Sequence, residues 1–205
     1  AYLRITVSRG AGEIGLDPSL CPRATVIIMA KPLHPSPPIL SRDGASLTIA
    51  KTRRNLPEAL SPQIKSTNFL NNILAKRESI AAGTFDSLFL NWKDELTECT
   101  VSNLFFISGK TLHTPALDCG ILDGITRTIV MTLAQEEGLP VQEGHYHLAD
   151  LQRAEECFLT NTSMEIMPVS RVDSLAIGDG KPGPLTRRLQ TRFADSRTRF
   201  LEPTS

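Results

Sequence analysis

Hydrophobic and polar positions alternate in several parts of the chain, a pattern typical of β-strands. Residues 1–9 alternate in this way and end at Gly10, so they predict a strand that runs into a glycine-rich loop. The apolar run at residues 25–30 is long enough for a buried strand and too short for a helix. Further strands are expected at residues 46–52, 86–91, 95–98, 103–108, 111–114, 141–143, 157–160 and 166–172.

Apolar residues recur at helical spacing elsewhere. Residues 66–82 predict an amphipathic helix that ends at Gly83, because glycine is a favoured helix cap. Three more helices are expected at residues 125–134, 149–155 and around Leu185, Leu189 and Phe193. Since strands and helices interleave without a strict βαβ rhythm, the chain is expected to form an α+β (mixed α/β) fold with a mixed sheet.

A cluster of prolines interrupts this pattern early in the chain. Four prolines lie within residues 32–38 and predict a stiff, extended connection. We therefore expect residues 1–40 to form a strand, a loop and a Pro-rich connection, and residues 41–205 to form the main domain.

The composition narrows the class of protein. The 205 residues include 22 Lys and Arg and 22 Asp and Glu, so the net charge is zero and gives no electrostatic reason to expect nucleic acid or an anionic membrane as partner. The chain is 40% hydrophobic and 21% charged, which is typical of a globular protein. No apolar run reaches about 18 residues and no signal-peptide pattern opens the chain, so a cytoplasmic location is predicted.

The metal-ligating residue types are scattered. The cysteines lie tens of residues apart without a Cys-x-x-Cys pair, which predicts reduced thiols and no zinc site. His145 and His147 alternate as on one face of a strand, but no third ligand lies in register with them, so no metal site is expected. The cysteines are Cys21, Cys99, Cys119 and Cys157.

Four positions could carry chemistry, and each has an ordinary alternative. Lys65 lies where a Pro-rich loop meets the first predicted helix, where partial desolvation lowers a lysine pKa and makes the amine nucleophilic. Glu98 precedes an apolar strand and could point into a cleft. Residues 124–127 begin a helix, a favourable place for an anion, and residues 160–163 form a hydroxyl-rich turn. Taken alone, each is more often a solvated surface residue, an ordinary helix end or a polar turn.

Together, four segments in this order resemble one family, the fold-type IV pyridoxal-phosphate enzymes or class IV aminotransferases. The segments are IKSTNFLNNILAK (64–76), TECTVSNLF (97–105), GILDGITR (120–127) and FLTNTSMEIMPV (158–169). The resemblance implies the large cofactor-binding domain of the D-amino-acid-aminotransferase-like fold at residues 41–205. Family members also carry a small N-terminal domain, and the chain is expected to lack it.

The resemblance also implies roles for single residues. Lys65 is expected to form the Schiff base with pyridoxal 5'-phosphate and to transfer the proton in transamination. Glu98 is expected to pair with the pyridine nitrogen of the cofactor. Ile125 and Thr126 are expected to bind the cofactor phosphate, which a helix N-terminus favours. Thr162 and Ser163 are expected to contact both cofactor and substrate.

The beginning of the chain resembles branched-chain aminotransferases in particular. Tyr2 and Arg4 are expected to bind the substrate, Tyr2 at its α-carboxylate and Arg4 at the side-chain carboxylate of glutamate. The predicted reaction is therefore transamination of branched-chain amino acids with 2-oxoglutarate, in a homodimer or larger homo-oligomer that binds an amino acid and a 2-oxo acid. Three alternatives remain: an aminodeoxychorismate lyase, a D-amino-acid aminotransferase, or an inactive cofactor-binding fragment.

Overall fold

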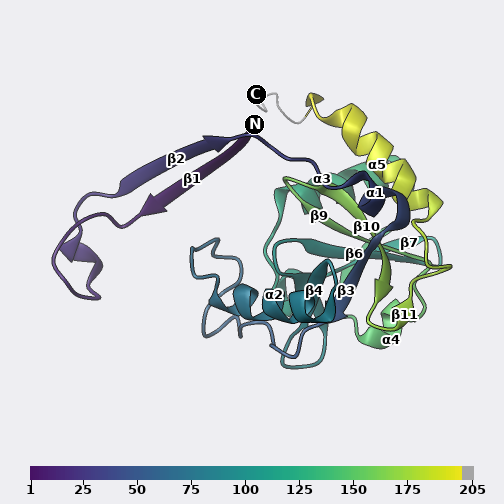
Figure 1. Ribbon diagram of the computed structural model, residues 1–205, viewed down its shortest axis with the longest axis horizontal. Helices are drawn as coiled ribbons and strands as arrows, with labels where there is room; N and C mark the ends of the chain where they lie inside the picture. Colours follow the sequence, from purple (N-terminus) through teal and green to yellow (C-terminus); the bar gives the residue numbers. More distant parts are fainter. Residues whose placement is uncertain (200–205) are drawn as a thin grey trace. The chain divides into compact units, whose positions relative to one another are not determined.

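The structure is a computed structural model in which residues 1–199 are described. The chain divides into two compact units, residues 1–35 and the part that begins at Ser36 (Figure 1). The division of roles between residues 1–40 and 41–205 stays a prediction.

The first unit is an antiparallel hairpin. Strands β1 (Tyr2–Ser8) and β2 (Thr25–Lys31) pair along their whole length, and the loop between them contains the short 3-10 helix η1 (Pro18–Leu20). The sequence predicted β2 to be buried, and this is wrong: all seven of its residues are exposed. A hairpin of two strands has no second layer to cover its faces, so the apolar run stays open within this unit.

The second unit is built on a mixed sheet whose strands close into a ring. Strand β10 pairs with β3 and β9, β9 pairs with β6, and β6 connects through β5 and β4 back to β3. Strands β7, β8 and β11 extend this ring. The strands are β3 (Ala45–Ile49), β4 (Asp86–Leu90), β5 (Leu96–Cys99), β6 (Asn103–Ser108), β7 (Thr111–Pro115), β8 (Val141–Gly144), β9 (Glu156–Asn161), β10 (Glu165–Val172) and β11 (Leu175–Ala176).

The strand β6 shows why the core has two parts. Its run of apolar residues is buried on both faces, as in strands that are covered on both sides. Leu104 and Phe106 belong to the cluster inside the ring, whereas Phe105 and Ile107 pack against the helices. Phe105 stacks on Phe158 of β9 with ring centroids 5.1 Å apart.

Helices cover the sheet. Helices α3 and α5 lie side by side and pack on β9, as Figure 1 shows, and α2 packs on β3 and β4. None of the helices in residues 1–199 is long and apolar enough to cross a membrane. The helical elements are α1 (Pro38–Asp43), α2 (Leu70–Ala82), η2 (Leu117–Cys119), α3 (Ile125–Glu136), α4 (Leu148–Leu151) and α5 (Pro184–Ser196).

Helix α2 differs from the sequence prediction in where it begins and in which face it buries. It begins at Leu70 rather than residue 66. Its end agrees with the prediction, because the cap Gly83 adopts a left-handed conformation with φ of 65°. Its large apolar residues do not face the core. Instead, α2 lies on the sheet through the small residues Ala75 and Ser79, and Ser87 donates a hydrogen bond to the Ala75 carbonyl at 2.6 Å. Small side chains let the helix approach closely, so its larger ones point outward: Leu70, Ile73, Leu74 and Ile80.

Two further predictions need correction. The helix expected at residues 149–155 is the single turn α4. His145 and His147 do not share a strand face, because β8 ends at Gly144.

The Pro-rich segment leads into α1, which begins at Pro38, a residue type well suited to the first turn of a helix.

Candidate functional site

A buried carboxylate lies at the centre of the candidate site. Glu98, on β5, is 5% exposed, and both of its oxygens accept hydrogen bonds. Arg54 Nη2 donates to Oε1 at 2.6 Å, while Asn103 Nδ2 and the Leu122 backbone N–H donate to Oε2 at 3.0 and 3.2 Å. These donors fix the carboxylate in one orientation.

Arg54 is itself held on several sides. Its Nε donates to the Gly120 carbonyl at 3.1 Å, and its guanidinium lies over the Phe89 ring, 5.3 Å from the centroid. Asn72 of α2 accepts a longer bond from Nη1 at 3.5 Å. Because Arg54 is 8% exposed, its charge depends on Glu98 for compensation.

Burial raises the pKa of Glu98 to about 7, even though several groups favour its ionised form. Arg54, the Leu122 N–H and the charge of Lys65 each act to lower it. The carboxyl therefore changes its charge near neutral pH, which makes it sensitive to a positive group placed beside it.

Lys65 lies in the loop before α2. The sequence favoured a helix start and partial desolvation, but the helix begins five residues later and the side chain is exposed. The structure nevertheless brings Lys65 close enough to Glu98 for its charge to stabilise the carboxylate. An exposed amine therefore lies within electrostatic range of a buried carboxyl.

A row of polar side chains crosses three strands at this point. Glu98 of β5 lies opposite Asn103 of β6, and Asn103 lies opposite Thr160 of β9. Directly paired residues share one face of a sheet, so all three side chains are on the face of Glu98. Thr160 Oγ1 is buried and has no hydrogen-bond partner among the described residues. The Thr160 hydroxyl of this row could therefore form a hydrogen bond with a polar ligand.

The N-terminus of α3 adjoins the same row. Asn103 Nδ2 also donates to the Leu122 carbonyl at 2.8 Å, which fixes the segment before the helix. No side chain among the described residues caps this end, where Gly124 is the N-cap. A Cβ on Gly124 would lie 2.2 Å from Asn103 Oδ1, so any side chain there would force Asn103 to move. The free N–H groups of Ile125 and Thr126 make this end suitable for an anion.

Thr162 and Ser163 lie in the exposed turn between β9 and β10. Asn161 shapes the turn, because its Oδ1 accepts from the Ser163 N–H at 2.9 Å. Its Nδ2 donates to the Val101 carbonyl at 3.2 Å and ties the turn to the segment before β6. The turn is therefore anchored next to the Asn103 row.

Tyr2 and Arg4 lie on β1 of the first unit, whereas the other six predicted site residues belong to the second. Tyr2 is half-buried, and Lys31 Nζ lies 5.0 Å from its ring centroid. Arg4 is exposed.

Sequence reasoning missed Arg54 and Asn103. Arg54 lies in an irregular loop where periodicity carries no information, and its only signal is the pair of arginines before Asn55. Asn103 lies within the TECTVSNLF segment, in which only Glu98 was predicted to be a site residue. Its spacing of five residues from Glu98 across a tight turn is the signal that could have found it.

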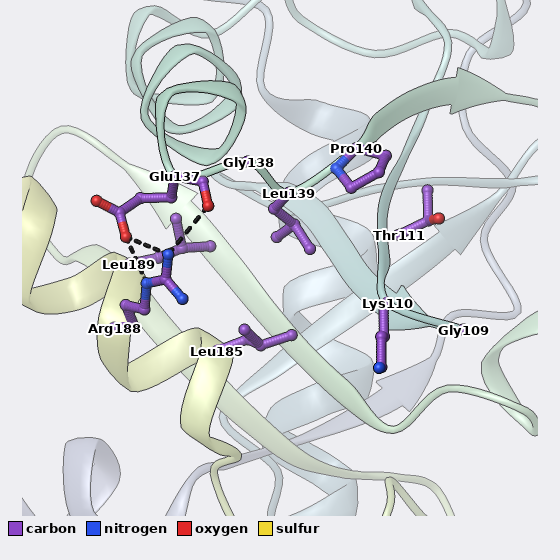
Figure 2. A pocket seen from close by; sticks show the side chains of 10 residues that line it. All are labelled: Gly109, Lys110, Thr111, Glu137, Gly138, Leu139, Pro140, Leu185, Arg188 and Leu189. Carbon is purple, nitrogen blue, oxygen red and sulfur yellow. Dashed lines mark hydrogen bonds and ion pairs between the residues drawn. The ribbon is translucent and has the colours of Figure 1, made fainter.

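One cavity of the second unit lies away from these residues. It has a volume of about 490 Å³ and lies between the end of α3, the β6–β7 turn and α5. Leu139, Leu185 and Leu189 form its apolar wall, and Arg188 beside them pairs with Glu137, as Figure 2 shows. None of the predicted cofactor-binding residues lines it, so the candidate site is the Glu98 row.

The chain is similar to several known proteins. It is 39% identical over 200 residues to the "Putative branched-chain-amino-acid aminotransferase" of Methanocaldococcus jannaschii, covering 98% of this chain and 68% of that protein. It is 34% identical to the aminodeoxychorismate lyase of Bacillus subtilis, covering 94% of this chain and 64% of that one.

Solved structures agree with these relatives. The branched-chain amino acid aminotransferase of Escherichia coli superposes with a TM-score of 0.91 at 29% identity, covering 95% of this chain and 64% of the other. The chain thus spans about two thirds of the length of these proteins. The family model of class IV aminotransferases matches residues 1–172. The mixed α/β fold and the family resemblance are confirmed, and the chain belongs to the class IV aminotransferases.

Proposed function

We propose that this chain is the cofactor-binding part of a pyridoxal-phosphate-dependent aminotransferase. The observation that carries the proposal is a buried and firmly held carboxylate, Glu98, with an exposed amine, Lys65, within electrostatic range of it. One solved relative, a branched-chain amino acid aminotransferase that is 29% identical to this chain, has been determined with pyridoxamine 5'-phosphate. When bound, the cofactor supplies an electron sink for the carbanion at the substrate Cα.

Glu98 keeps a proton on the pyridine nitrogen in this proposal. Arg54, Asn103 and Leu122 already donate to both carboxylate oxygens and hold them in place. A protonated ring nitrogen adds a second cation, which favours the ionised form of Glu98 over the neutral form that burial favours. The carboxylate and the ring proton therefore stabilise each other.

The N-terminus of α3 and the β9–β10 turn bind the phosphate in this proposal. Ile125 and Thr126 offer unpaired backbone N–H groups at the positive end of a helix of 12 residues. Thr162 and Ser163 add exposed hydroxyls from a turn that Asn161 anchors. Fixing the phosphate there would hold the cofactor in place next to Lys65 during turnover.

Lys65 has two tasks. Its amine would hold the cofactor by condensing with the aldehyde and releasing water, and once displaced it would take the proton from the substrate Cα and return it. An exposed position suits both tasks, because the amine must be reached by cofactor and substrate in turn.

We propose that L-branched-chain amino acids donate the amino group and 2-oxoglutarate accepts it to give glutamate, which is the donor in the reverse direction. The similarity to branched-chain aminotransferases supports this substrate class, with Tyr2 and Arg4 contacting the carboxylates. A cytoplasmic homodimer is part of the same proposal. The 34% identity to an aminodeoxychorismate lyase over 94% of the chain supports a second candidate, elimination of pyruvate.

The test is a half-reaction followed by absorbance. The cofactor-loaded protein is mixed with L-leucine, L-glutamate, L-alanine or D-alanine, and conversion to the pyridoxamine form is recorded. L-Leucine and L-glutamate are expected to react fastest. The Lys65→Ala variant is expected to lose the reaction, whereas Lys51→Ala, which removes another exposed lysine, keeps it.

Each alternative has its own result. Preference for D-alanine indicates a D-amino-acid aminotransferase, and release of pyruvate from aminodeoxychorismate without an acceptor indicates the lyase. Cofactor binding without any exchange indicates an inactive fragment. Full transamination by Lys65→Ala refutes the proposed chemistry.

A further inference from the structure

Three side chains from separate segments meet outside the candidate cofactor site. Glu95 precedes β5, Cys119 ends η2, and His145 follows β8. One ligand atom from each lies within 4.8 Å of the other two. His145 Nδ1 is 3.1 Å from Glu95 Oε1 and 3.6 Å from Cys119 Sγ. The sequence predicted no metal site, because the cysteines form no Cys-x-x-Cys pair and no third ligand lay in register with His145 and His147.

The two separations at His145 are close to those of tetrahedral zinc. Zinc–sulfur and zinc–nitrogen bonds of about 2.3 and 2.0 Å at tetrahedral angles separate the two ligand atoms by about 3.5 Å, and nitrogen and oxygen ligands by about 3.4 Å. The separations of 3.6 and 3.1 Å at His145 Nδ1 differ from these by a few tenths of an ångström.

Neighbouring residues orient the three side chains. His145 Nε2 lies 3.3 Å from Asp118 Oδ2, the arrangement in which a carboxylate fixes the other nitrogen of a metal-binding histidine. Asn91 Nδ2 donates to Glu95 Oε2 at 2.7 Å and leaves Oε1 directed at His145. Glu95 and Cys119 are buried, whereas the His145 side chain is 44% exposed, so an ion here is reachable from solvent.

We propose that Glu95, Cys119 and His145 bind one Zn²⁺ ion through Oε1, Sγ and Nδ1, with solvent as the fourth ligand. Zinc suits this mixed set, because thiolate and imidazole bind it well, whereas Mg²⁺ and Ca²⁺ prefer oxygen alone. Binding replaces the Cys119 S–H bond with an S–Zn bond and releases that proton to solvent. No electron is transferred.

The ion joins the β4–β5 turn, η2 and the end of β8. Gly120, next to Cys119, accepts the hydrogen bond from Arg54, so the zinc site borders the segment that positions Glu98.

The experiment measures zinc binding directly. Tag-free protein is treated with a chelator, dialysed and titrated with Zn²⁺ against a chromophoric chelator. We expect one zinc ion per chain and no competition from Mg²⁺. Co²⁺ in place of zinc is expected to give a thiolate charge-transfer band.

Matched variants identify the ligands. Cys119→Ser and His145→Gln are expected to abolish stoichiometric binding, whereas Cys21→Ser and His147→Gln bind zinc like the parent. Asp118→Asn, at an exposed position that leaves the ligands in place, is expected to weaken binding about 10- to 100-fold. Circular dichroism checks the fold of each variant. Absence of binding in the parent, or unchanged binding in folded Cys119→Ser or His145→Gln, overturns the proposal.

Discussion

Replacing Arg54 by methionine tests whether the Arg54–Glu98 pair governs the candidate site. Methionine keeps most of the apolar volume over Phe89 but removes the charge and the donors to Glu98 and Gly120. Removing one partner of a buried ion pair costs about 3–5 kcal/mol of unfolding free energy, because the remaining charge loses its compensation. We expect this loss at pH 8.5, where Glu98 of the parent is ionised.

The loss is expected to depend on pH. Without Arg54 the folded-state pKa of Glu98 rises above its parental value of about 7, because a group that lowers it has gone. Below pH 7 both proteins hold a neutral carboxyl, so the variant loses only its hydrogen bonds. Above pH 7 the Glu98 carboxyl of the folded parent ionises, whereas that of the folded variant stays neutral. The unfolding equilibrium constants of the two proteins therefore diverge by about tenfold per pH unit until Glu98 of the variant ionises too.

Urea denaturation of the cofactor-free protein at pH 6 and pH 8.5, followed by circular dichroism, measures both effects. Arg53→Met is the matched control, because Arg53 pairs with Asp94 at the surface and such a pair contributes less than about 1 kcal/mol. The reasoning is refuted if Arg54→Met costs no more than Arg53→Met, or if its cost is equal at the two pH values.

The remaining predictions concern the same row of residues. In the cofactor-free parent, the contribution of Glu98 to the free energy of unfolding is expected to fall as pH rises from 4.5 to about 7, because the folded state holds the Glu98 proton more tightly than the unfolded state. Urea titrations of the parent and Glu98→Gln across that range measure this fall, and identical pH profiles would contradict it. Glu98→Gln is expected to slow transamination by about 100-fold or more while the cofactor still bonds to Lys65. Stopped-flow absorbance measures the rate and mass spectrometry measures the attachment of the cofactor. An unchanged rate would show that the carboxylate is not needed. Asn103→Leu is expected to cost about 1–3 kcal/mol in urea denaturation, since Glu98 and the Leu122 carbonyl each lose a donor, and a neutral effect would contradict this. Gly124→Ala is expected to cost about 1–3 kcal/mol and to weaken cofactor binding, measured by fluorescence titration, because the new methyl group meets Asn103; tight binding by the variant would argue against a phosphate at α3.

The elements that local pattern specifies were predicted well. Strand β6 and helix α3 follow directly from an apolar run and a helical spacing, and Gly83 marks the end of α2 because it adopts the left-handed conformation. The start of α2 was predicted four residues too early, since no side chain caps it and the apolar spacing continues into the preceding loop.

The residues that face the core, and the contacts between distant segments, could not be predicted from local pattern. The apolar residues of α2 point outward, because Ala75 and Ser79 allow the closer approach to the sheet. Arg54 reaches Glu98 across 44 positions, and Cys119 reaches His145 across 26. Such contacts depend on how strands pair rather than on sequence spacing. Local sequence therefore offered Lys65 and Glu98 only as weak candidates until the resemblance strengthened them, and it gave Arg54 no more than its place in a pair of arginines.

The central claim is that Lys65 carries the bond to the cofactor, and borohydride reduction tests it most directly. The protein is loaded with pyridoxal 5'-phosphate, reduced, digested and mapped by mass spectrometry. Lys76 is the internal comparison, because it is half-exposed on α2, the helix that follows Lys65, but it donates to the Phe85 carbonyl and pairs with Asp86. We predict one stable adduct per chain, on Lys65. An adduct on Lys76 or another lysine, or no adduct at saturating cofactor, contradicts the account.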